Sequence, residues 1–487
     1  MEQSANTPPL IAFDNSYARD LAGFYVAQAP ATPPTPQLLQ FNTDLAAELG
    51  LDARVAEQAS VLFSGATLPA GATPIAQAYA GHQFGGFSPQ LGDGRAVLLG
   101  EVIDAAGARR DIALKGSGWT PFSRGGDGKA VVGPVLREYL IGEAMHALGI
   151  PTSRALAAVA TGEVVYRDAA LPGAVLTRVA ASHIRIGTFQ FFAARGEWDK
   201  VQKLADYAIA RHYPEVTAAD KPYLAFFDAV TRAQARLIAQ WMGVGFIHGV
   251  MNTDNMTISG ETIDYGPCAF MEAYAPGTVY SSIDHNGRYA YANQPLILGW
   301  NLARLAETLL PLFDADEDRA VALATERLQG IAALYRTEWT QVMRGKLGLM
   351  GQQDGDAALA DGLLAAMEGQ NADWTLTFRR LSSAVGGDDS LVAAGFEDPA
   401  ALLAWLPQWR ARLASDAAVQ MDRVNPNVIP RNHLMEEALA SATAGDLGPF
   451  RAMLAAVADP FGAVAGREVY ALPAPSGFGP YKTFCGT

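Results

Sequence analysis

The stretch from residue 246 to 266 holds the side chains whose types and spacing best suit chemistry. It contains Asn255 and, in the sequence Asp-Tyr-Gly, Asp264. Apolar residues on both sides of Ser259-Gly260-Glu261 predict a hairpin with Asn255 and Asp264 at its two open ends. An amide oxygen and a carboxylate are hard ligands, which Mg²⁺ prefers when it is held against phosphates. We therefore expect a metal-binding hairpin over 246–266; a buried polar turn is the alternative.

The same stretch is similar to two protein-kinase motifs. Asp264-Tyr265-Gly266 resembles the kinase D-F-G, and His248-Gly249 followed by Asn255 resembles the catalytic loop H-R-D-x-x-x-x-N. In that loop an Asp stands five positions before the Asn, whereas this chain has Val250, which cannot accept a proton. The nearest carboxylate is Asp254. Either catalysis is lost, or the chemistry differs from that of an ordinary kinase.

An earlier segment supplies groups that suit nucleotide phosphates. Gly92 and Gly94 precede an apolar run, and glycines let backbone N–H groups approach phosphate closely. Lys115 ends a short apolar strand, in the order of the kinase V-A-I-K element, whose Lys pairs with a helix Glu. Glu138 and Glu143 both lie on the next helix, at opposite edges of its apolar stripe, so helical geometry does not choose between them. An ordinary turn and a surface lysine are the alternative interpretations.

Arg178 and Arg185 each have apolar neighbours in sequence, as if they projected from ordered backbone. Guanidinium groups suit phosphate oxygens, and two converging ones would offset the charge of a triphosphate. A pair of structural salt bridges with nearby acids is an equally good interpretation from the residues alone.

The chain has two cysteines, Cys268 and Cys485, in 487 residues. This count excludes a disulfide-framed secreted fold and metal sites of the CxxC type. Cys268 follows Asp264 by four residues, so a mobile tail carrying Cys485 could act as a redox lever if it reached Cys268. Two unpaired cytosolic thiols are the default interpretation.

Composition narrows the class of protein. Half the residues are hydrophobic and 18% are charged, which excludes wholesale disorder. The formal net charge of −14 argues against a general nucleic-acid binder and against docking on an anionic membrane. The first residues show no basic region followed by an apolar segment, and no apolar run approaches about 20 residues. We expect a cytoplasmic protein, and nothing in the sequence demands a dimer.

The elements that must position these residues divide into two parts. Short β-like runs and one helix, at 135–148, fill residues 81–180, and the chain after about 200 is mostly helical. The segment 38–51 also has a helical pattern, whereas 351–362 is typical of a polar loop. The expected fold is α+β and bilobal: an N-terminal segment and β-rich lobe over 1–190, and a larger helical lobe with a C-terminal tail over 191–487. The cleft between two such lobes is a natural ligand site.

Several motifs together resemble the selenoprotein O (SelO, bacterial YdiU) family of pseudokinases. They are Gly81-His82-Gln83-Phe84-Gly85, Leu91-Gly92-Asp93-Gly94-Arg95, Lys115-Gly116-Ser117-Gly118, His248-Gly249-Val250-Met251-Asn252-Thr253-Asp254-Asn255 and, near the end, Asn425-Pro426-Asn427 with Arg431-Asn432-His433. The resemblance implies a protein-kinase-like fold that binds ATP in a flipped orientation, with the α-phosphate facing the acceptor. The implied reaction moves AMP to a Ser, Thr or Tyr hydroxyl of a protein and releases pyrophosphate. The resemblance also allows UTP with Mn²⁺ as the substrate and metal.

The resemblance also implies roles for individual residues. Lys115 and Glu138 form the strand–helix ion pair, Asn255 and Asp264 hold Mg²⁺ or Mn²⁺, and Asp254 is the proton acceptor. The residues expected to contact the nucleotide are Gly92, Gly94, Arg95, Lys115, Asp127, Gly128, Arg178, Arg185 and Asp264. Cys268 and Cys485 match the family's regulatory disulfide pair, since Cys485 stands where eukaryotic members carry selenocysteine.

Two other functions stay open at this point. One is a conventional ATP-dependent phosphotransferase, and the other is a non-catalytic nucleotide-binding scaffold. The presence of both hard metal ligands, Asn255 and Asp264, disfavours the scaffold without excluding it.

Overall fold

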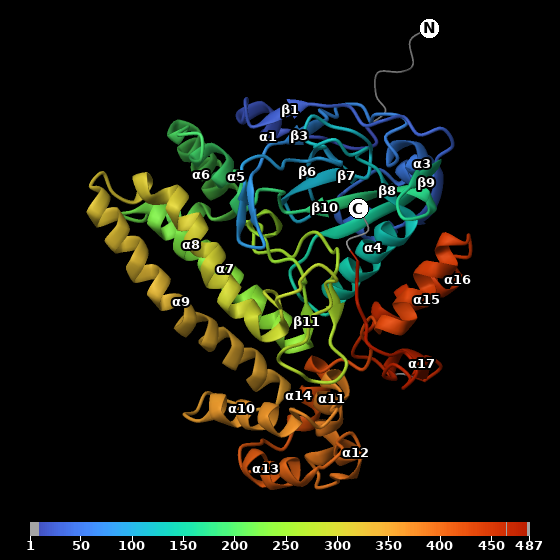
Figure 1. Ribbon diagram of the computed structural model, residues 1–487, viewed down its shortest axis with the longest axis vertical. Helices are drawn as coiled ribbons and strands as arrows, with labels where there is room; N and C mark the ends of the chain where they lie inside the picture. The colour runs from blue at the N-terminus through green and yellow to red at the C-terminus, as the bar shows by residue number, and fades with distance from the viewer. Residues whose placement is uncertain (1–8, 464, 485–487) are drawn as a thin grey trace.

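The computed structural model describes residues 9–463 and 465–484. The fold is α+β: strands from the first part of the chain form one large antiparallel sheet, and most of the later chain is helical (Figure 1). In Figure 1 the sheet lies in the upper half of the molecule, α7, α8 and α9 run down its left side, and α10–α14 lie at the bottom.

Within the described residues the large sheet has eight strands. Seven follow one another in the order β1 (Tyr25–Ala27), β3 (Ile75–Gln77), β6 (Ala96–Ile103), β7 (Arg109–Lys115), β10 (Ala170–Ala180), β9 (Arg154–Tyr166) and β2 (Gln37–Phe41), and β8 (Ala130–Val131) pairs with β10. The small hairpin of β4 (Gly81–Gln83) and β5 (Gly86–Ser88) is separate from this sheet. Central strands β6, β7 and β10 are almost wholly buried, which explains their nearly continuous apolar sequence.

Helices cover the sheet on both faces. On one face Ile112 and Leu114 of β7 pack among residues of the N-terminal helices α2 (Thr43–Glu48) and α3 (Ala59–Leu62). On the other face Ala113 joins the large core built on α4 (Val132–Ala147) and the helices that follow. Because successive side chains of a strand alternate between faces, Lys115 lies on the α4 face with Ala113.

The later helices form the rest of the fold. They are α5 (Ile186–Ala193), α6 (Trp198–His212), α7 (Pro222–Val244), α8 (Gln294–Phe313), α9 (Glu317–Lys346), α10 (Asp356–Met367), α11 (Trp374–Ala384), α12 (Ser390–Ala393), α13 (Ala400–Arg410), α14 (Ala417–Val424), α15 (Asn432–Thr443), α16 (Gly448–Val457) and α17 (Glu468–Ala471). Helix α1 (Ser16–Asp20) belongs to the N-terminal part. Helices α15 and α16 return to pack against α4. The predicted boundary at residue 190 falls inside α5, and the division into two domains stays a prediction.

The structure corrects two of the predicted elements. Residues 38–41 are not helical, because they form the edge strand β2 on β9, and Asn42 then caps α2 by accepting from the Leu45 N–H at 3.0 Å. Residues 356–362 are helical rather than a loop, because Ala360 and Leu363 bury one face of α10. In both places the secondary structure of a short segment is determined by the element that it packs against.

The metal-ligand hairpin expected over 246–266 is reduced to a single antiparallel bridge between Met256 and Thr262. Strand β11 (Phe246–Ile247) instead pairs with β12 (Ala269–Phe270), which follows the end of the expected hairpin. The segment between β11 and β12 is therefore held as one closed loop.

The segment Tyr291–Phe313, which includes α8, is long and apolar enough to cross a membrane by length and composition. The segment is not an unbroken apolar run, because Arg304 and Glu307 interrupt it. Half of its most apolar window is buried inside the fold, and α8 packs on α7 and α9. The core helix of a globular protein passes the same test.

Arg431, from one of the C-terminal motifs, ties four parts of the fold together. Its side chain is fully buried, and Nη1 donates to Glu272 at 2.6 Å and to Asp373 at 2.7 Å. Nη2 donates to the Ala471 carbonyl at 3.3 Å. The neighbouring Asn432 donates to the Phe270 carbonyl on β12. The C-terminal helices are thereby anchored to the chain that follows Asp264.

We predict that Arg431→Leu lowers the free energy of unfolding by about 3 kcal/mol, because it removes a fully buried cation and leaves two partly buried carboxylates without their partner. Urea unfolding followed by tryptophan fluorescence measures the loss. Arg451→Leu is the matched control, since this exposed arginine donates to the Leu39 carbonyl at the surface and its loss is expected to cost less than about 0.5 kcal/mol. Equal effects of the two substitutions would contradict the assigned role.

Candidate functional site

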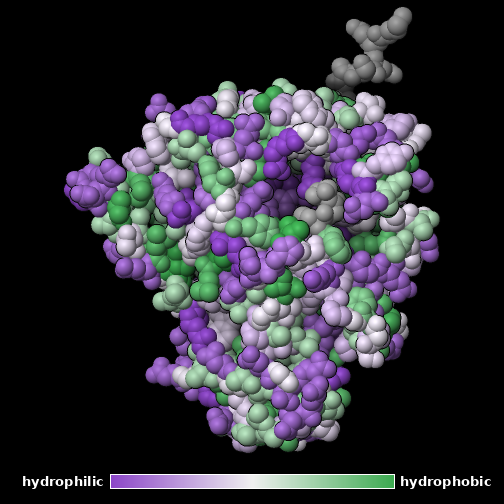
Figure 2. Space-filling view, in the orientation of Figure 1, coloured by the Kyte–Doolittle hydropathy of each residue, from purple (hydrophilic) through white to green (hydrophobic). Residues whose placement is uncertain are grey.

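A cavity of about 620 Å³ opens between the sheet, α4 and the loop that follows β11. Figure 2 shows a recess lined by hydrophilic residues in the upper half of the molecule. Among the described residues that line the cavity are seven Lys and Arg side chains and five carboxylates. The chain as a whole carries a net charge of −14, so this local balance of charge favours an anionic ligand.

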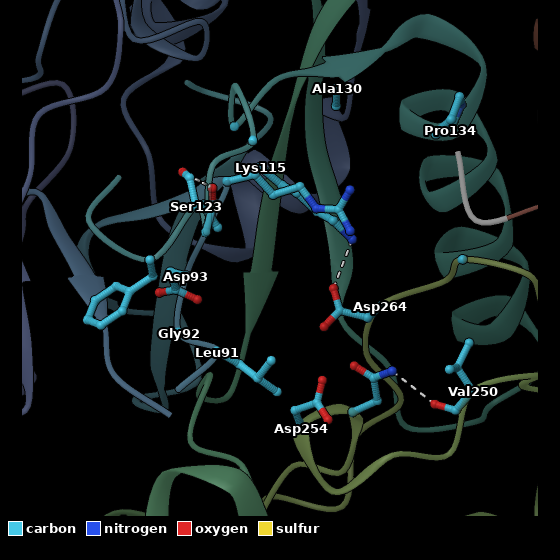
Figure 3. A pocket seen from close by; sticks show the side chains of 18 of the residues that line it. Leu91, Gly92, Asp93, Lys115, Ser123, Ala130, Pro134, Val250, Asp254 and Asp264 are labelled. Atoms are coloured by element: carbon cyan, nitrogen blue, oxygen red, sulfur yellow. Dashed lines mark hydrogen bonds and ion pairs between the residues drawn. The ribbon is translucent and has the colours of Figure 1, made fainter. Parts of the chain in front are cut away.

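Three cations surround the carboxylate of Asp264. Lys115 Nζ lies 2.8 Å from Oδ1, Arg178 Nη1 lies 2.5 Å from the same oxygen, and Arg185 Nη1 lies 2.5 Å from Oδ2. Figure 3 shows Asp264 facing the cavity with a guanidinium group bonded to it. Both arginines are buried, at 2% exposure. The sequence left two interpretations of these arginines open: structural salt bridges, or groups that bind phosphate. The structure is compatible with both, because the arginines pair with Asp264 and Asp264 lines the cavity.

The sheet explains why Lys115 and Arg178 meet. Lys115 ends β7, and Arg178 lies opposite Ala113 on the neighbouring strand β10, so both side chains project from the α4 face. Glu138 on α4 reaches both cations: Lys115 Nζ at 2.6 Å and Arg178 Nη1 at 3.2 Å. Glu143 instead binds Arg154, at 2.7 Å. The tertiary structure thus selects Glu138, which the helix pattern alone did not.

Asp264 is held in an uncommon state. Its backbone has a φ of +61°, which a non-glycine residue seldom adopts and which is often found at functional sites. Burial raises the pKa of its carboxyl, but the charges of Arg178, Lys115 and Arg185 outweigh burial and hold the pKa well below its usual value. The carboxylate is therefore ionised at any physiological pH.

Asp254 lines the same cavity, and Figure 3 shows its carboxylate on the cavity side, below Asp264. Oδ2 accepts a hydrogen bond from Gln83 Nε2 at 3.1 Å, whereas Oδ1 is buried and has no partner among the described residues. The Asp254 carbonyl accepts from Arg185 Nη1 at 2.6 Å. Burial raises the pKa of Asp254 to about 6.

Asn255 is oriented by its neighbour in the loop. Its Nδ2 donates to the Val250 carbonyl at 2.9 Å (Figure 3). This bond fixes the amide group and does not involve the amide oxygen. Val250 itself lines the cavity, where it offers no group that accepts a proton. The loop is supported by His248, whose Nε2 donates to the Ile263 carbonyl at 2.9 Å.

The donor atoms near Asp264 fit a hard divalent cation only together with a ligand. No group of three or more His, Cys, Asp and Glu side chains suited to a metal occurs in residues 9–463 and 465–484. The oxygens of Asn255 and Asp264 match the donor chemistry of Mg²⁺, which is commonly held by one or two protein oxygens together with substrate phosphates. The residues present therefore fit a metal that arrives with a nucleotide.

The predicted glycines line the cavity at positions where no Cβ fits. A Cβ on Gly92 would lie 2.3 Å from the Phe122 ring, and one on Gly128 would lie 2.0 Å from the Gly118 carbonyl oxygen. Both glycines also have positive φ, at +72° and +69°. Gly94 has no room beside the Phe122 carbonyl, at 2.7 Å. The two glycine loops close against each other around Phe122 and form the roof of the cavity.

Arg95 and Asp127 also line the cavity, but they differ in whether the side chain is bonded to another residue. The Arg95 guanidinium has no hydrogen-bond partner within the described part of the chain, so it is available to a ligand. Asp127 forms a two-bond ion pair with Arg167, with both N–O distances 2.9 Å. Arg167 was not predicted from the sequence, because a lone arginine near a strand end carries no motif. Other lining residues that the sequence did not indicate are Tyr79, Gln83, Asp93, Arg124 and Lys129.

Cys268 is fully buried, and burial raises the pKa of its thiol to about 12. Cys485 lies outside the described residues. The described tail nevertheless reaches the neighbourhood of Cys268, because Thr483 Oγ1 donates to the carbonyl of Pro267 at 2.7 Å. Thr483 also donates its N–H to the Tyr280 carbonyl at 2.8 Å.

The sequence model of the family described as "Protein adenylyltransferase SelO" matches residues 10–458. The chain belongs to the SelO family. A "Protein nucleotidyltransferase YdiU" from Cereibacter sphaeroides (strain KD131) is 67% identical over 478 residues, which cover 98% of this chain and 99% of that protein. Proteins of the same description from Rhizobium johnstonii and Rhizobium meliloti (strain 1021) are 58% and 57% identical, each over 98% of this chain and over 97% and 99% of their own lengths.

Within this SelO member, Gly81 limits where Asp254 can lie. A Cβ at Gly81 would stand 2.5 Å from Asp254 Oδ1, so we predict that Gly81→Ala displaces the carboxylate and lowers kcat for nucleotide transfer at least tenfold. The melting temperature is expected to change little. Gly299→Ala on α8, where nothing lies within 4 Å of the new Cβ, is the control with unchanged activity. Full activity of Gly81→Ala would show that the position of Asp254 does not matter.

Proposed function

We propose that this protein is a protein adenylyltransferase, which moves AMP from ATP to a Ser, Thr or Tyr hydroxyl of a protein and releases pyrophosphate. The family assignment covers nearly the whole chain. The observation that carries the proposal is the cluster of Lys115, Arg178 and Arg185 around Asp264 on the wall of the cavity. Buried, fixed cations are suited to the charge that develops on a pyrophosphate leaving group.

We infer that the fold is protein-kinase-like. The strand–helix pair of Lys115 and Glu138, and the order of the loops that carry Asn255 and Asp264, support this likeness. The departure is Val250, which lines the cavity at the position where a kinase carries its catalytic Asp. A nucleotide lying in the kinase orientation would present its γ-phosphate to a group that accepts no proton. A reversed triphosphate, with its terminal phosphates on the buried cations, presents the α-phosphorus instead.

Asn255 and Asp264 would hold the divalent cation, with Mg²⁺ proposed and Mn²⁺ as the alternative. A bound cation supplies Lewis-acid stabilisation of the phosphate oxygens. Gly92, Gly94, Arg95 and Gly128 would contact the nucleotide through the loops that roof the cavity, and Asp127 would take part through its pair with Arg167.

In the proposed step the acceptor hydroxyl oxygen forms a bond to the α-phosphorus, and the bond from the α-phosphorus to the bridging oxygen breaks. Pyrophosphate leaves with that electron pair, and the hydroxyl proton passes to Asp254. Asp254 lines the cavity, and its carboxylate is the proposed acceptor for that proton. With a pKa of about 6, Asp254 is mostly ionised at neutral pH and returns the proton readily.

We predict that ATP labelled at the α-phosphate transfers its label to protein, whereas ATP labelled at the γ-phosphate does not. Label retained after denaturing electrophoresis, together with the intact mass of the product, measures the transfer. Asp264→Ala is the control and is expected to lose the label, because it removes the carboxylate that the three cations surround. Transfer from the γ position alone would establish a phosphotransferase, and no transfer from either would establish a nucleotide-binding scaffold.

We further propose that Cys268 and Cys485 form a regulatory disulfide. The tail is tied to the carbonyl of Pro267, next to Cys268, up to two residues before Cys485. Because burial raises the pKa of the Cys268 thiol to about 12, the reduced thiol stays protonated at neutral pH and reacts slowly.

A reductant is therefore expected to change the transfer activity of the oxidised protein, and Cys485→Ser is expected to abolish that response. Activity with and without dithiothreitol, together with non-reducing mass analysis, measures the effect. Thr483→Val removes the hydroxyl that donates to the Pro267 carbonyl and keeps both cysteines. It is expected to change the rate at which the disulfide forms. A full redox response in Cys485→Ser would contradict the proposal.

A further inference from the structure

A chain of buried polar groups runs from the cavity along the same face of the sheet to helix α6. Arg178 Nε donates to Nε2 of His183 at 3.2 Å, and Nδ1 of His183 lies 2.9 Å from Asp111 Oδ2. Arg211 on α6 binds the other Asp111 oxygen at 2.6 Å, and its Nη1 binds Glu101 Oε1 at 2.5 Å. All five side chains are at most 4% exposed. The proposed reaction uses only Arg178 among them.

The two neighbours of His183 fix its protonation independently. The Nε of an arginine is always a donor, so Nε2 of His183 must carry a lone pair. The carboxylate of Asp111, whose pKa is about 2, can only accept, so Nδ1 must carry the hydrogen. Asp111 Oδ2 also accepts the backbone N–H of His183 at 2.9 Å, which holds the ring in place. His183 is therefore a neutral imidazole of one defined tautomer, and burial lowers its pKa in agreement with this state.

This arrangement determines how Arg178 presents its charge. A guanidinium is planar, so fixing Nε at His183 and Nη1 at Glu138 and Asp264 sets the orientation of the whole group. Nη2 has no hydrogen-bond partner within the described residues, and Arg178 lines the cavity. The remaining donor is therefore left for an oxygen of the bound anion.

We propose that His183 is a positioning residue for nucleotide binding: as a neutral Nδ1–H imidazole held by Asp111 and Arg211, it orients the guanidinium of Arg178 toward the phosphates of ATP. The proposal rests on the proposed function in one respect only, that the anion bound in the cavity is a nucleoside triphosphate. In this proposal Asp111 holds the imidazole directly, and Arg211 holds Asp111. His183 itself does not contact the substrate.

Two substitutions of His183 separate its two bonds. His183→Asn keeps an amide near the Nδ1 position, within reach of Asp111, and loses the acceptor for Arg178. His183→Gln places an amide oxygen near the Nε2 position and keeps that acceptor. We expect His183→Asn to weaken ATP binding about tenfold, measured by calorimetry with Mg²⁺ and ATP, and His183→Gln to bind within about twofold of the unsubstituted protein.

His212→Asn is the matched control. His212 is a nearby histidine whose Nε2 bonds Ser182 Oγ at 2.8 Å and which does not contact Arg178. It is expected to lose stability as His183→Asn does, with an unchanged Kd for ATP. Unchanged ATP binding in His183→Asn, or the same weakening in His183→Gln and His212→Asn, overturns the proposal.

A measurement on the unsubstituted protein covers the case in which His183→Asn does not fold. In ¹⁵N-histidine NMR spectra, the His183 signals are expected to show a protonated Nδ1 and an unprotonated Nε2, with the assignment taken from His183→Gln. A protonated Nε2 would overturn the proposal, because it could not accept from Arg178. Because ATP binding and NMR need no acceptor protein, these results are independent of whether AMP is transferred.

Discussion

The carboxylate of Asp264 organises the site, because three cations from three different elements converge on it. Lys115 comes from β7, Arg178 from β10 and Arg185 from the N-terminal end of α5, and each lies within 2.8 Å of an Asp264 oxygen. Positive charges this close repel one another in a buried place, and only a shared anion makes their convergence stable. In the proposed function a bound triphosphate would offer these cations further anionic oxygens, so the cluster that stabilises the fold would also bind the substrate.

The loop from His248 to Asn255 depends on close packing against this cluster. Arg185 donates to the Asp254 carbonyl as well as to Asp264, so one guanidinium links the two acidic residues. Glycines make this approach possible: a Cβ on Gly187 would lie 2.1 Å from the Ala80 carbonyl oxygen, and one on Gly81 would strike Asp254. In the motif that contains Gly81, the glycine therefore leaves space for Asp254, and Gln83 donates to the Asp254 carboxylate.

The C-terminal helices support the same region from the other side. Arg431 and Asn432 bind the chain just after Asp264, through Glu272 and the Phe270 carbonyl. The chain that follows Asp264 is therefore held in place by polar bonds to the C-terminal helices. The tail then adds Thr483 at Pro267, which places the end of the described chain beside Cys268.

Sequence reasoning was most successful where residue type and chain position determine structure locally. Strand β7 ends at Lys115 and α4 carries Glu138, as the apolar run before Lys115 and the helical pattern over 135–148 predict. The pattern failed at residues 38–41, because an edge strand exists only when its partner β9 is present. The predicted metal hairpin also shrank to one bridge, since pairing of β11 with β12 closes the loop elsewhere.

By itself the sequence determined which chemical groups are present: oxygens suited to a hard metal ion, cations suited to phosphate, glycines for tight turns, and Val250 where the kinase motif has an Asp. Only the tertiary structure decided which of these groups meet. It chose Glu138 over Glu143, gave Asp127 to Arg167, and joined Arg178 to His183 and Asp111. The reason is that a side chain's type follows from its own residue, whereas its partner depends on which strands and helices pack together, and those contacts join positions far apart in the chain.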